Sequence, residues 1–356
     1  MNIGILTSGG DCPGLNAAIR GVAKASYEMF DNVTIYGIED GYGGLINGRY
    51  RKMNPFDFSG ILTLGGTILG TSRQPFKKMR DIEDDGIDKV KSMIKNYEKM
   101  KLDCLITIGG NGTHKSADML SNEGLNVIGL PKTIDNDLWG TDVTFGFHTA
   151  VDIATDVLDR IHTTADSHGR VMVVELMGHK AGWLNLYAGI AGGADIILIP
   201  EIPFEHKKVI KAVENRTSEG KKFSIVAIAE GAMSKKEALM NSSELADYRA
   251  SSGYFSVAHR VAAKIQQNTG LETRVVSPGH TVRGGSPSPY DRILSTRFGV
   301  HAAELIKEKD FGRTVALENN QISSNKLSDI AGKLKLVPDN CEMVIDARNL
   351  GISFGD

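Results

Sequence analysis

The feature that most restricts the fold of this chain is a junction that repeats along it: a short apolar run ends in a glycine pair, and a helical pattern follows. The run at 2–8 is followed in this way by a helical pattern at 15–27, and the run at 103–108 by one at 114–122. Short apolar runs that are bounded by glycine and alternate with amphipathic helices are typical of buried parallel strands. The junctions therefore predict an α/β fold with a mainly parallel sheet.

The same alternation continues through the second half of the chain, where a second parallel sheet is expected. Because 356 residues exceed the size of a usual single core, we also expect two domains. A polar connector is predicted at 247–253. The strands predicted in this half begin at 171, 195, 223 and 272, and the helices cover 181–191, 207–219 and 255–268.

The composition argues against several classes of function. A net charge of −2 and the absence of a Lys/Arg stripe disfavour a nucleic-acid binder. No apolar run approaches the roughly 20 residues of a membrane span, and the N-terminus shows no signal-peptide pattern. The three cysteines, Cys12, Cys104 and Cys341, have no C-x-x-C spacing, which favours a reducing compartment. A cytoplasmic location is therefore predicted.

The stretch PKTIDND at 131–137 is the main candidate for chemistry. It follows an apolar run, which Pro131 ends because proline lacks the N–H that a sheet ladder needs. Asp135 and Asp137 stand one residue apart and could divide the roles of proton acceptor and metal ligand. Open α/β sheets bind ligands beyond the carboxyl ends of their strands, which favours a catalytic loop. An Asx-rich turn is the other interpretation, and the residues of this stretch leave both open.

Three glycine-rich segments are candidates for phosphate binding. GGDCPG at 9–14 and GGNGT at 109–113 follow predicted strands, so bare backbone N–H groups and a helix N-terminus would face an anion. The segment at 9–14 matches neither the Rossmann fingerprint nor the Walker A pattern. The third segment, at 65–73, ends in hydroxyls and Arg73, which is suited to neutralising a transferring phosphoryl group. Each segment alone is also compatible with a tight turn or a surface arginine, but together they indicate a nucleotide or polyphosphate site.

A further glycine-rich stretch near 279–285 carries His280 and Arg283, and Arg274 precedes it. Arginine forks onto phosphate oxygens, so this set suits a sugar phosphate. Unrelated surface arginines are the alternative interpretation.

Five segments, taken together, closely resemble the ATP-type 6-phosphofructokinase family, whose mixed-substrate group is related to pyrophosphate-dependent members. The resemblance extends from residue 1 to about residue 305. Its motifs are GGDCPGLN at 9–16, GGTILGTSR at 65–73, PKTIDND at 131–137, MGH at 177–179 and PGHTVRGGSP at 278–287.

The resemblance implies transfer of the γ-phosphate of ATP to the 1-hydroxyl of fructose 6-phosphate, with Mg²⁺ as the cofactor. Asp135 matches the base that accepts the hydroxyl proton, and Thr133 and Arg73 match residues that contact the transferring phosphate. The implied donor-binding residues are Gly9, Ser72, Arg73, Gly110, Asn111, Gly112, Thr113 and Lys132, and the implied metal ligands are Asn111 and Asp137. The implied sugar-phosphate pocket consists of Thr133, Asp135, Asp137, Arg170, Met177, Gly178, His179, Glu230, Arg274, His280 and Arg283.

The resemblance also implies two Rossmann-like αβα domains with mainly parallel sheets and an active site in the cleft between them. In the family, the residues that match Arg170 and Arg274 reach in from a neighbouring subunit, which implies a homotetramer with shared sites. The implied domains are a donor domain at 1–138 plus about 253–305, and a sugar-phosphate domain at 139–252 plus about 306–356.

Three positions depart from the family pattern. Asn111 replaces a metal-binding aspartate and brings no charge to a hard cation. Lys132 replaces a glycine and is typical of pyrophosphate-dependent members, whereas Gly112 is typical of ATP users. His179 stands where an arginine usually contacts the sugar. Pyrophosphate as the donor and a non-catalytic phosphosugar or nucleotide sensor are therefore open alternatives. A nicotinamide dehydrogenase is disfavoured because no G-x-G-x-x-G follows the first strand.

Overall fold

The computed structural model describes residues 1–82, 86–338 and 340–356. It divides into two compact units, between which the chain passes after Thr149, Val282 and Lys335. No helix within the described ranges has the length and apolar content that a bilayer crossing requires. The first unit consists of residues 1–149 and 283–335, and the second of residues 150–282 and 336–356.

The first unit is built on a seven-stranded sheet in the order β11-β10-β5-β4-β1-β2-β3. The five inner strands run parallel, and β3 and β11 pair antiparallel to their neighbours at the two edges. The strands are β1 Asn2–Ser8, β2 Thr34–Ile38, β3 Tyr50–Met53, β4 Cys104–Gly109, β5 Val127–Pro131, β10 Arg313–Glu318 and β11 Gln321–Lys326.

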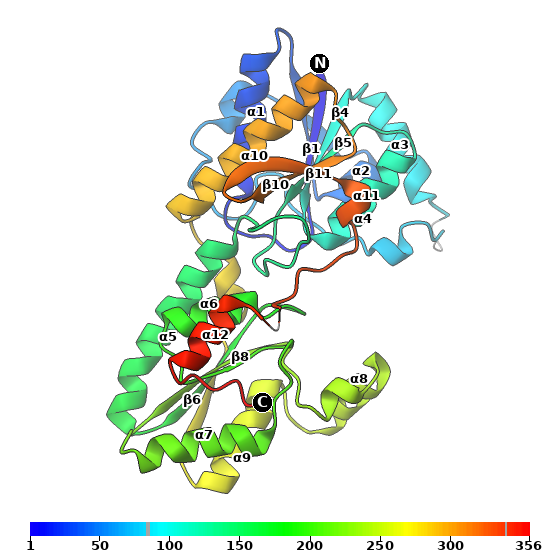
Figure 1. Cartoon of the computed structure of the whole chain (residues 1–356). Coiled ribbons are helices and arrows are strands. Elements are labelled where there is room, and N and C mark those ends of the chain that lie inside the picture. Colours follow the sequence, from blue (N-terminus) through cyan, green and yellow to red (C-terminus); the bar gives the residue numbers. More distant parts are fainter. Residues whose placement is uncertain (83–85, 339) are drawn as a thin grey trace. The chain divides into compact units, whose positions relative to one another are not determined.

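Helices cover both faces of this sheet (Figure 1). Buried side chains of α2, α3 and α4 pack against Leu6, Leu105 and Val127 on one face. On the other face α1 and α10 lie side by side, and bare glycines allow their close approach. A Cβ on Gly21 would lie 2.7 Å from a backbone oxygen of α10, and one on Gly299 would lie 2.6 Å from the backbone of α1. The helices and 3₁₀ turns are α1 Leu15–Met29, α2 Tyr42–Asn47, η1 Pro55–Phe58, η2 Phe76–Lys78, α3 Lys89–Lys99, α4 Asn111–Asn122, α10 Pro289–Glu308 and α11 Leu327–Ile330.

The register of the sheet brings three strand ends to one level. Ser8 pairs with Gly109, and Gly109 pairs with Pro131. Because β1, β4 and β5 run parallel, the loops that follow them start side by side at the same edge of the sheet.

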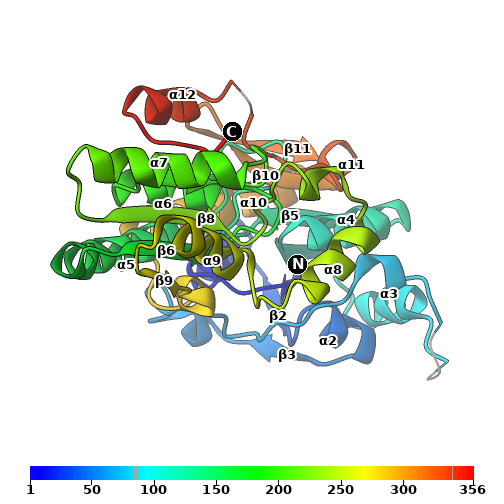
Figure 2. The same ribbon diagram turned by 90° about the horizontal axis from the view of Figure 1, so that it is seen from below.

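The second unit has a four-stranded parallel sheet in the order β7-β8-β6-β9. Helices α7 and α9 bury their apolar sides on one face, around Val171, Val226 and Ile228. Gly189 of α6 lies against Ile197 and Ala227. These two residues pair with each other and alternate along their strands with Ile196, Val226 and Ile228, so they face the opposite side of the sheet. Figure 2 shows α6, α7 and α9 around the strands of this unit. The strands are β6 Val171–Leu176, β7 Ile196–Leu198, β8 Ser224–Ala229 and β9 Thr273–Val276. The helices and turns are α6 Trp183–Ala191, α7 His206–Ser218, η3 Glu237–Leu239, α8 Ser242–Ser251, α9 Val257–Thr269 and α12 Glu342–Asn349. Helix α5 Phe147–His168 begins in the first unit, and the turn η4 Gly279–Arg283 ends there.

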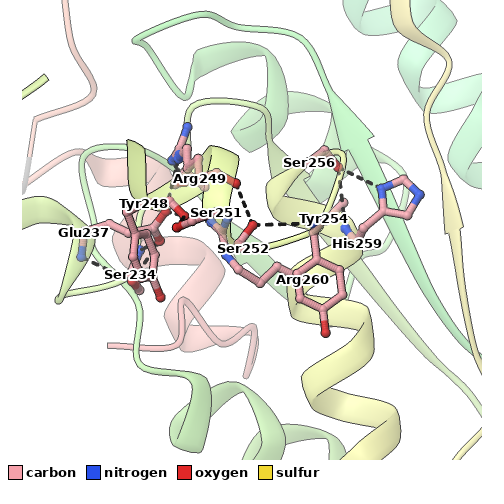
Figure 3. Close-up of polar contacts among 12 residues, drawn as sticks. Ser234, Glu237, Tyr248, Arg249, Ser251, Ser252, Tyr254, Ser256, His259 and Arg260 are labelled. Carbon is pink, nitrogen blue, oxygen red and sulfur yellow. Dashed lines mark hydrogen bonds and ion pairs between the residues drawn. The ribbon is translucent and has the colours of Figure 1, made fainter. Parts of the chain in front are cut away.

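Helix α8 has no buried residue and is joined to the rest of its unit by a buried ion cluster (Figure 3). The carboxylate of Glu237, which is 0% exposed, accepts hydrogen bonds from Arg249 of α8 at 3.1 Å and from Arg260 of α9 at 2.7 Å. The backbone and side chain of Ser234 donate to the same carboxylate. Arg249 also donates to the carbonyl oxygen of Ala232. These polar contacts fasten a helix that has no apolar face.

The mainly parallel α/β fold predicted from the sequence is confirmed, but two segments differ. The stretch at 247–253, predicted as a connector, lies largely within α8. The prediction was wrong because this helix is polar on all sides and its sequence therefore shows no apolar periodicity. Its capping box, with Asn241 and Glu244 bonded reciprocally, was the signal that could have found it. The hairpin of β10 and β11 was also not predicted.

The two units differ from the predicted domains. Residues 257–276 were predicted in the first domain but lie in the second unit, because β9 pairs with β6. Residues 313–326 were predicted in the second domain but lie in the first unit, because β10 pairs with β5. Strand pairing between segments far apart in sequence decides this division, and no local pattern reports it.

Candidate active site

The loop after β1 is held by the segment at 71–73. The N–H of Gly9 donates to the carbonyl oxygen of Ser72 at 3.1 Å, and Oγ1 of Thr71 donates to the carbonyl oxygen of Gly9 at 2.7 Å. Gly9 has a φ of 84°, a left-handed conformation that glycine adopts without strain. Arg73 follows directly and is exposed. The structure thus brings together Gly9, Ser72 and Arg73, which the sequence placed in separate motifs.

Two cationic side chains converge on the same loop. Nζ of Lys132 donates to the carbonyl oxygen of Gly10, and Nη1 of Arg283 donates to that of Asp11 at 3.1 Å. A Cβ on Gly10 would lie 3.0 Å from Nη1 of Arg283, so the bare backbone is what admits the guanidinium. Burial lowers the pKa of Lys132, and the nearby charge of Arg283 lowers it further, while the carboxylate of Asp135 opposes the shift. This concentration of positive charge beside bare amides suits a phosphate ligand.

The loop at 131–137 is fastened by hydrogen bonds from side chains. The N–H of Asp135 donates to Oγ1 of Thr133 at 3.0 Å, and Oγ1 of Thr144 donates to the carbonyl oxygen of Thr133 at 2.7 Å. Oδ1 of Asn136, a residue with a φ of 50°, accepts from the N–H of Thr144 at 3.1 Å. The side chains of Asp135 and Asp137 are 9% and 8% exposed. These contacts give the two carboxylates a defined backbone position at the end of β5.

The loop after β4 opens helix α4, whose N-terminus carries Gly110, Asn111, Gly112 and Thr113. A Cβ on Gly109 would lie 2.1 Å from Oγ1 of Thr113, so only glycine fits at the end of this strand. A Cβ on Gly112 would meet no atom within 4 Å, which leaves open space over the first turn of the helix. A helix N-terminus with open space in front of it favours an anion.

Both polar atoms of the Asn111 side chain are hydrogen-bonded to the backbone. Its Oδ1 accepts from the N–H of Gly332 at 2.9 Å, and its Nδ2 donates to the carbonyl oxygen of Lys333 at 3.0 Å. Within the described ranges no three His, Cys, Asp or Glu side chains cluster at metal-binding spacing. Of the two predicted ligands, Asp137 therefore offers a carboxylate, whereas both polar atoms of Asn111 are engaged by the backbone.

In the second unit the turn after β6 meets the end of β8. His179 has a φ of 52°, and its N–H donates to Oε1 of Glu230 at 2.9 Å. A Cβ on Gly231 would lie 2.1 Å from the carbonyl oxygen of His179, so the two loops touch through bare backbone. The turn residues Met177 and Gly178 lie beside them. Four predicted sugar-phosphate residues are thereby brought together.

Glu272 joins two other predicted residues of this unit. It lies 2.9 Å from Nη2 of Arg170 and 2.5 Å from Nη2 of Arg274. The hydrogen bond from Arg170 is the main reason that the pKa of Glu272 is lowered. Glu272 was not predicted as a site residue. Its position two residues before Arg274, on the same face of an extended strand, was the signal that could have indicated an ion pair. His280 lies nearby in the chain, in the short turn η4.

The predicted residues of the first unit gather at one edge of its sheet, whereas those of the second unit do not form a single group. Arg170 and Arg274 meet at Glu272 beside the amino end of β6, and Met177, Gly178 and His179 follow its carboxyl end. The first unit holds Gly9, Ser72, Arg73, Gly110, Asn111, Gly112, Thr113, Lys132, Thr133, Asp135, Asp137 and Arg283, and the second holds Arg170, Met177, Gly178, His179, Glu230, Arg274 and His280.

The loops that follow β1, β4 and β5 bring bare glycine amides, cations and carboxylates to one edge of the sheet. An α/β unit of this kind has the architecture of a nucleotide- or polyphosphate-binding protein. Comparison with known proteins makes the class specific. The family model described as Phosphofructokinase matches residues 2–306. The chain belongs to the phosphofructokinase family.

Several relatives match over nearly their whole length. The chain is 57% identical to an ATP-dependent 6-phosphofructokinase of Spirochaeta thermophila, over 99% of this chain and 97% of that one. It is 48% identical to ATP-dependent 6-phosphofructokinase 3 of Bacteroides thetaiotaomicron, over the full length of both. Among solved structures, phosphofructokinase from Saccharomyces cerevisiae matches with a TM-score of 0.80 and 30% identity, over 92% of this chain and 45% of that chain. The present chain thus spans about half the length of the yeast one.

Proposed function

We propose that this protein transfers the γ-phosphate of ATP to the 1-hydroxyl of fructose 6-phosphate, giving fructose 1,6-bisphosphate and ADP, as a glycolytic kinase. The proposal is supported by the names of relatives that match over their full length. The structural observation that carries it is the position of Asp135. Its loop leaves β5 at the same sheet edge as the glycine loops after β1 and β4.

In the proposed reaction the sugar oxygen forms a bond to the γ-phosphorus as the bond from that phosphorus to the β-γ bridging oxygen breaks. Asp135 accepts the proton of the hydroxyl. Thr133 and Arg73 bind oxygens of the transferring group, where Arg73 offsets its charge. The other phosphates of ATP rest on the amides of the glycine loops, the N-terminus of α4 and the ammonium of Lys132.

The geometry fits Mg²⁺ held by few protein atoms. In proteins this ion is usually bound by one or two carboxylates and by substrate phosphates, and it keeps several waters. Asp137 is the residue that would hold it here. Asn111 would not, because its amide is bonded to the backbone at 332–333. When bound, the ion neutralises charge on the phosphates of the donor.

The sugar-phosphate group is proposed to bind through the residues of the second unit. Glu230 and the turn at 177–179 suit the sugar hydroxyls, and the arginines suit the phosphate. We further propose that Arg170 and Arg274 serve a site of a neighbouring subunit in a homotetramer, and that the protein acts in the cytoplasm.

Pyrophosphate is the second candidate for the donor, and Lys132 is the observation that favours it. The open space over Gly112 favours ATP, because a nucleotide needs room at this helix N-terminus. A sensor without activity is the third candidate, suggested by Asn111 and His179.

The test is an assay of one preparation with fructose 6-phosphate and either ATP or pyrophosphate. We expect turnover with ATP and only background turnover with pyrophosphate. Asp135→Asn keeps the shape of the side chain but removes the proton acceptor, so it should lower kcat by at least about 100-fold. Asp156→Asn, a change at an exposed ion pair on α5, is the matched control and should retain kcat. Turnover with pyrophosphate but not with ATP would show that pyrophosphate is the donor. No turnover with either donor would favour the sensor without activity.

A further inference from the structure

We propose that the segment at 332–335 is a positioning clamp for the catalytic loop, in which Lys335 holds Asn136 and Asn111 holds the segment itself. The inference rests on the proposed function for its catalytic consequence. The segment at 332–335 lies outside the motifs that carry the family resemblance, and it binds the motif at 131–137 through Asn136 and Asp137.

Lys335 binds the loop at two points. Its Nζ donates to Oδ1 of Asn136 at 2.9 Å, and its backbone N–H donates to the carbonyl oxygen of Asp137 at 2.9 Å. Leu334 forms an isolated antiparallel bridge with Leu138. The clamp therefore binds the backbone at 137–138, two residues after Asp135, and also the side chain of Asn136, which has the positive φ.

The clamp has a rigid support on the sheet. Nζ of Lys335 also donates to the carbonyl oxygens of Thr141 and Asp142, at 2.9 and 2.7 Å. That turn is fixed to β10: Oγ1 of Thr141 accepts from the N–H of Leu317 at 2.9 Å, and the N–H of Asp142 donates to the carbonyl oxygen of Leu317 at 2.7 Å. The ammonium of Lys335 thus links the loop to a turn that is itself bonded to β10, and it donates to three oxygen atoms.

The two hydrogen bonds of Asn111 account for an amide at the position where the family has an aspartate. The Asn111 side chain accepts from the N–H of Gly332 and donates to the carbonyl oxygen of Lys333, which an amide can do and an ionised carboxylate cannot. A carboxylate would place a negative oxygen against the carbonyl of Lys333 and lose that hydrogen bond. Asn111 therefore holds the clamp segment through two hydrogen bonds. The chain passes to the second unit directly after Lys335, at the end of this segment.

The first experiment compares Lys335→Met with Lys333→Met, which alters an exposed lysine of the same segment. If the clamp positions Asp135, K335M should lower kcat by about 10- to 100-fold, with little change in KM for either substrate. K333M should behave like the wild type. In an Asp135→Asn background K335M should cause no further loss, because its effect passes through that carboxylate. Equal losses in both backgrounds, or a K335M enzyme with wild-type kcat, would overturn the proposal.

The second experiment approaches the clamp from Asn111. The clamp predicts that Asn111→Asp lowers kcat by about fivefold, the effect of one lost hydrogen bond. A metal-ligand role predicts the opposite, namely higher activity at low Mg²⁺. A gain in N111D would therefore refute the clamp.

A third readout does not depend on turnover. Hydrogen exchange of peptides covering 132–146 should be faster in K335M and N111D than in the wild type and K333M, while exchange in β6 is unchanged. This keeps the proposals separable. If exchange is faster in K335M and N111D but the wild type shows no kinase activity, the clamp is supported and the proposed function is refuted. If exchange is unchanged in both variants, the clamp is refuted.

Discussion

Nε2 of His114 lies 2.8 Å from Oγ1 of Thr314, and its Nδ1 lies 3.0 Å from the carbonyl oxygen of Gly110. Because a carbonyl can only accept, Nδ1 carries the proton, and the neutral ring accepts from the threonine hydroxyl through Nε2. The ring is 1% exposed and lies in the first turn of α4, next to the proposed phosphate site. Burial lowers the pKa of His114 to about 4.

This buried histidine predicts a loss of stability in mild acid. The unfolded chain binds a proton near pH 6.5 and the folded chain only near pH 4, so the stabilising contribution is complete above pH 6.5 and is lost as pH falls towards 4. The total is about 3 kcal/mol. Urea unfolding of wild type and His114→Gln at several pH values checks this. We expect a smaller acid loss in H114Q, and equal slopes would contradict the assignment.

Gly112 predicts how the donor is accommodated. Gly112→Asp places a carboxylate in open space at the N-terminus of α4, so the fold should be retained. The added charge should repel a phosphate there and raise KM for ATP by about tenfold or more. Gly112→Ala is the control, because its methyl group also meets no atom within 4 Å. Steady-state kinetics of the three proteins would decide, and a similar KM in all of them would show that no donor phosphate lies near this turn.

The ion cluster of Figure 3 predicts a stability effect remote from the proposed chemistry. Glu237→Gln leaves Arg260, which is 6% exposed, without its counter-charge and should lower the free energy of unfolding by roughly 3–5 kcal/mol. Thermal unfolding measures the loss, and proteolysis within 242–251 should become faster because α8 loses its anchor. Glu244→Gln, an exposed change at the cap of the same helix, should have little effect. A comparable loss in both variants would argue against the buried pair.

Subunit complementation tests whether Arg274 serves a neighbouring site. Arg274→Ala should raise KM for fructose 6-phosphate by about 10-fold or more, since it removes a charge-assisted contact to phosphate. Mixed oligomers of R274A and D135N subunits contain some sites with both intact residues if the two come from different chains. Reassembly of an equal mixture should then restore up to about a quarter of wild-type activity. No recovery in verified hybrids would place both residues in the same chain.

Much of the first unit could be predicted because its signals are local. Strand β1 is followed directly by glycine, β4 ends at glycine and β5 ends at proline, and the helices after β1 and β4 begin close behind these breaks. The loop at 131–137, with Asp135 and Asp137, stood out for the same reason. Helix α8 did not, because its charged residues are stabilised by Glu237 and not by an apolar face. Glu272 was also missed, because its role is to lie between two arginines that only the sheet pairing of β6 and β9 brings together.

The sequence by itself determined the class of fold and the residues able to do chemistry, because strand ends, glycine turns and helix starts are specified by neighbours in the chain. The tertiary structure alone decided what those residues touch. Asn136 and Lys335 are 199 positions apart, and Asn111 and Gly332 are 221 apart, yet each pair shares a hydrogen bond. A residue type determines which bonds a side chain can form, whereas only the packed backbone determines the partner. The backbone at 332–333 is thus the partner of the Asn111 side chain in the structure.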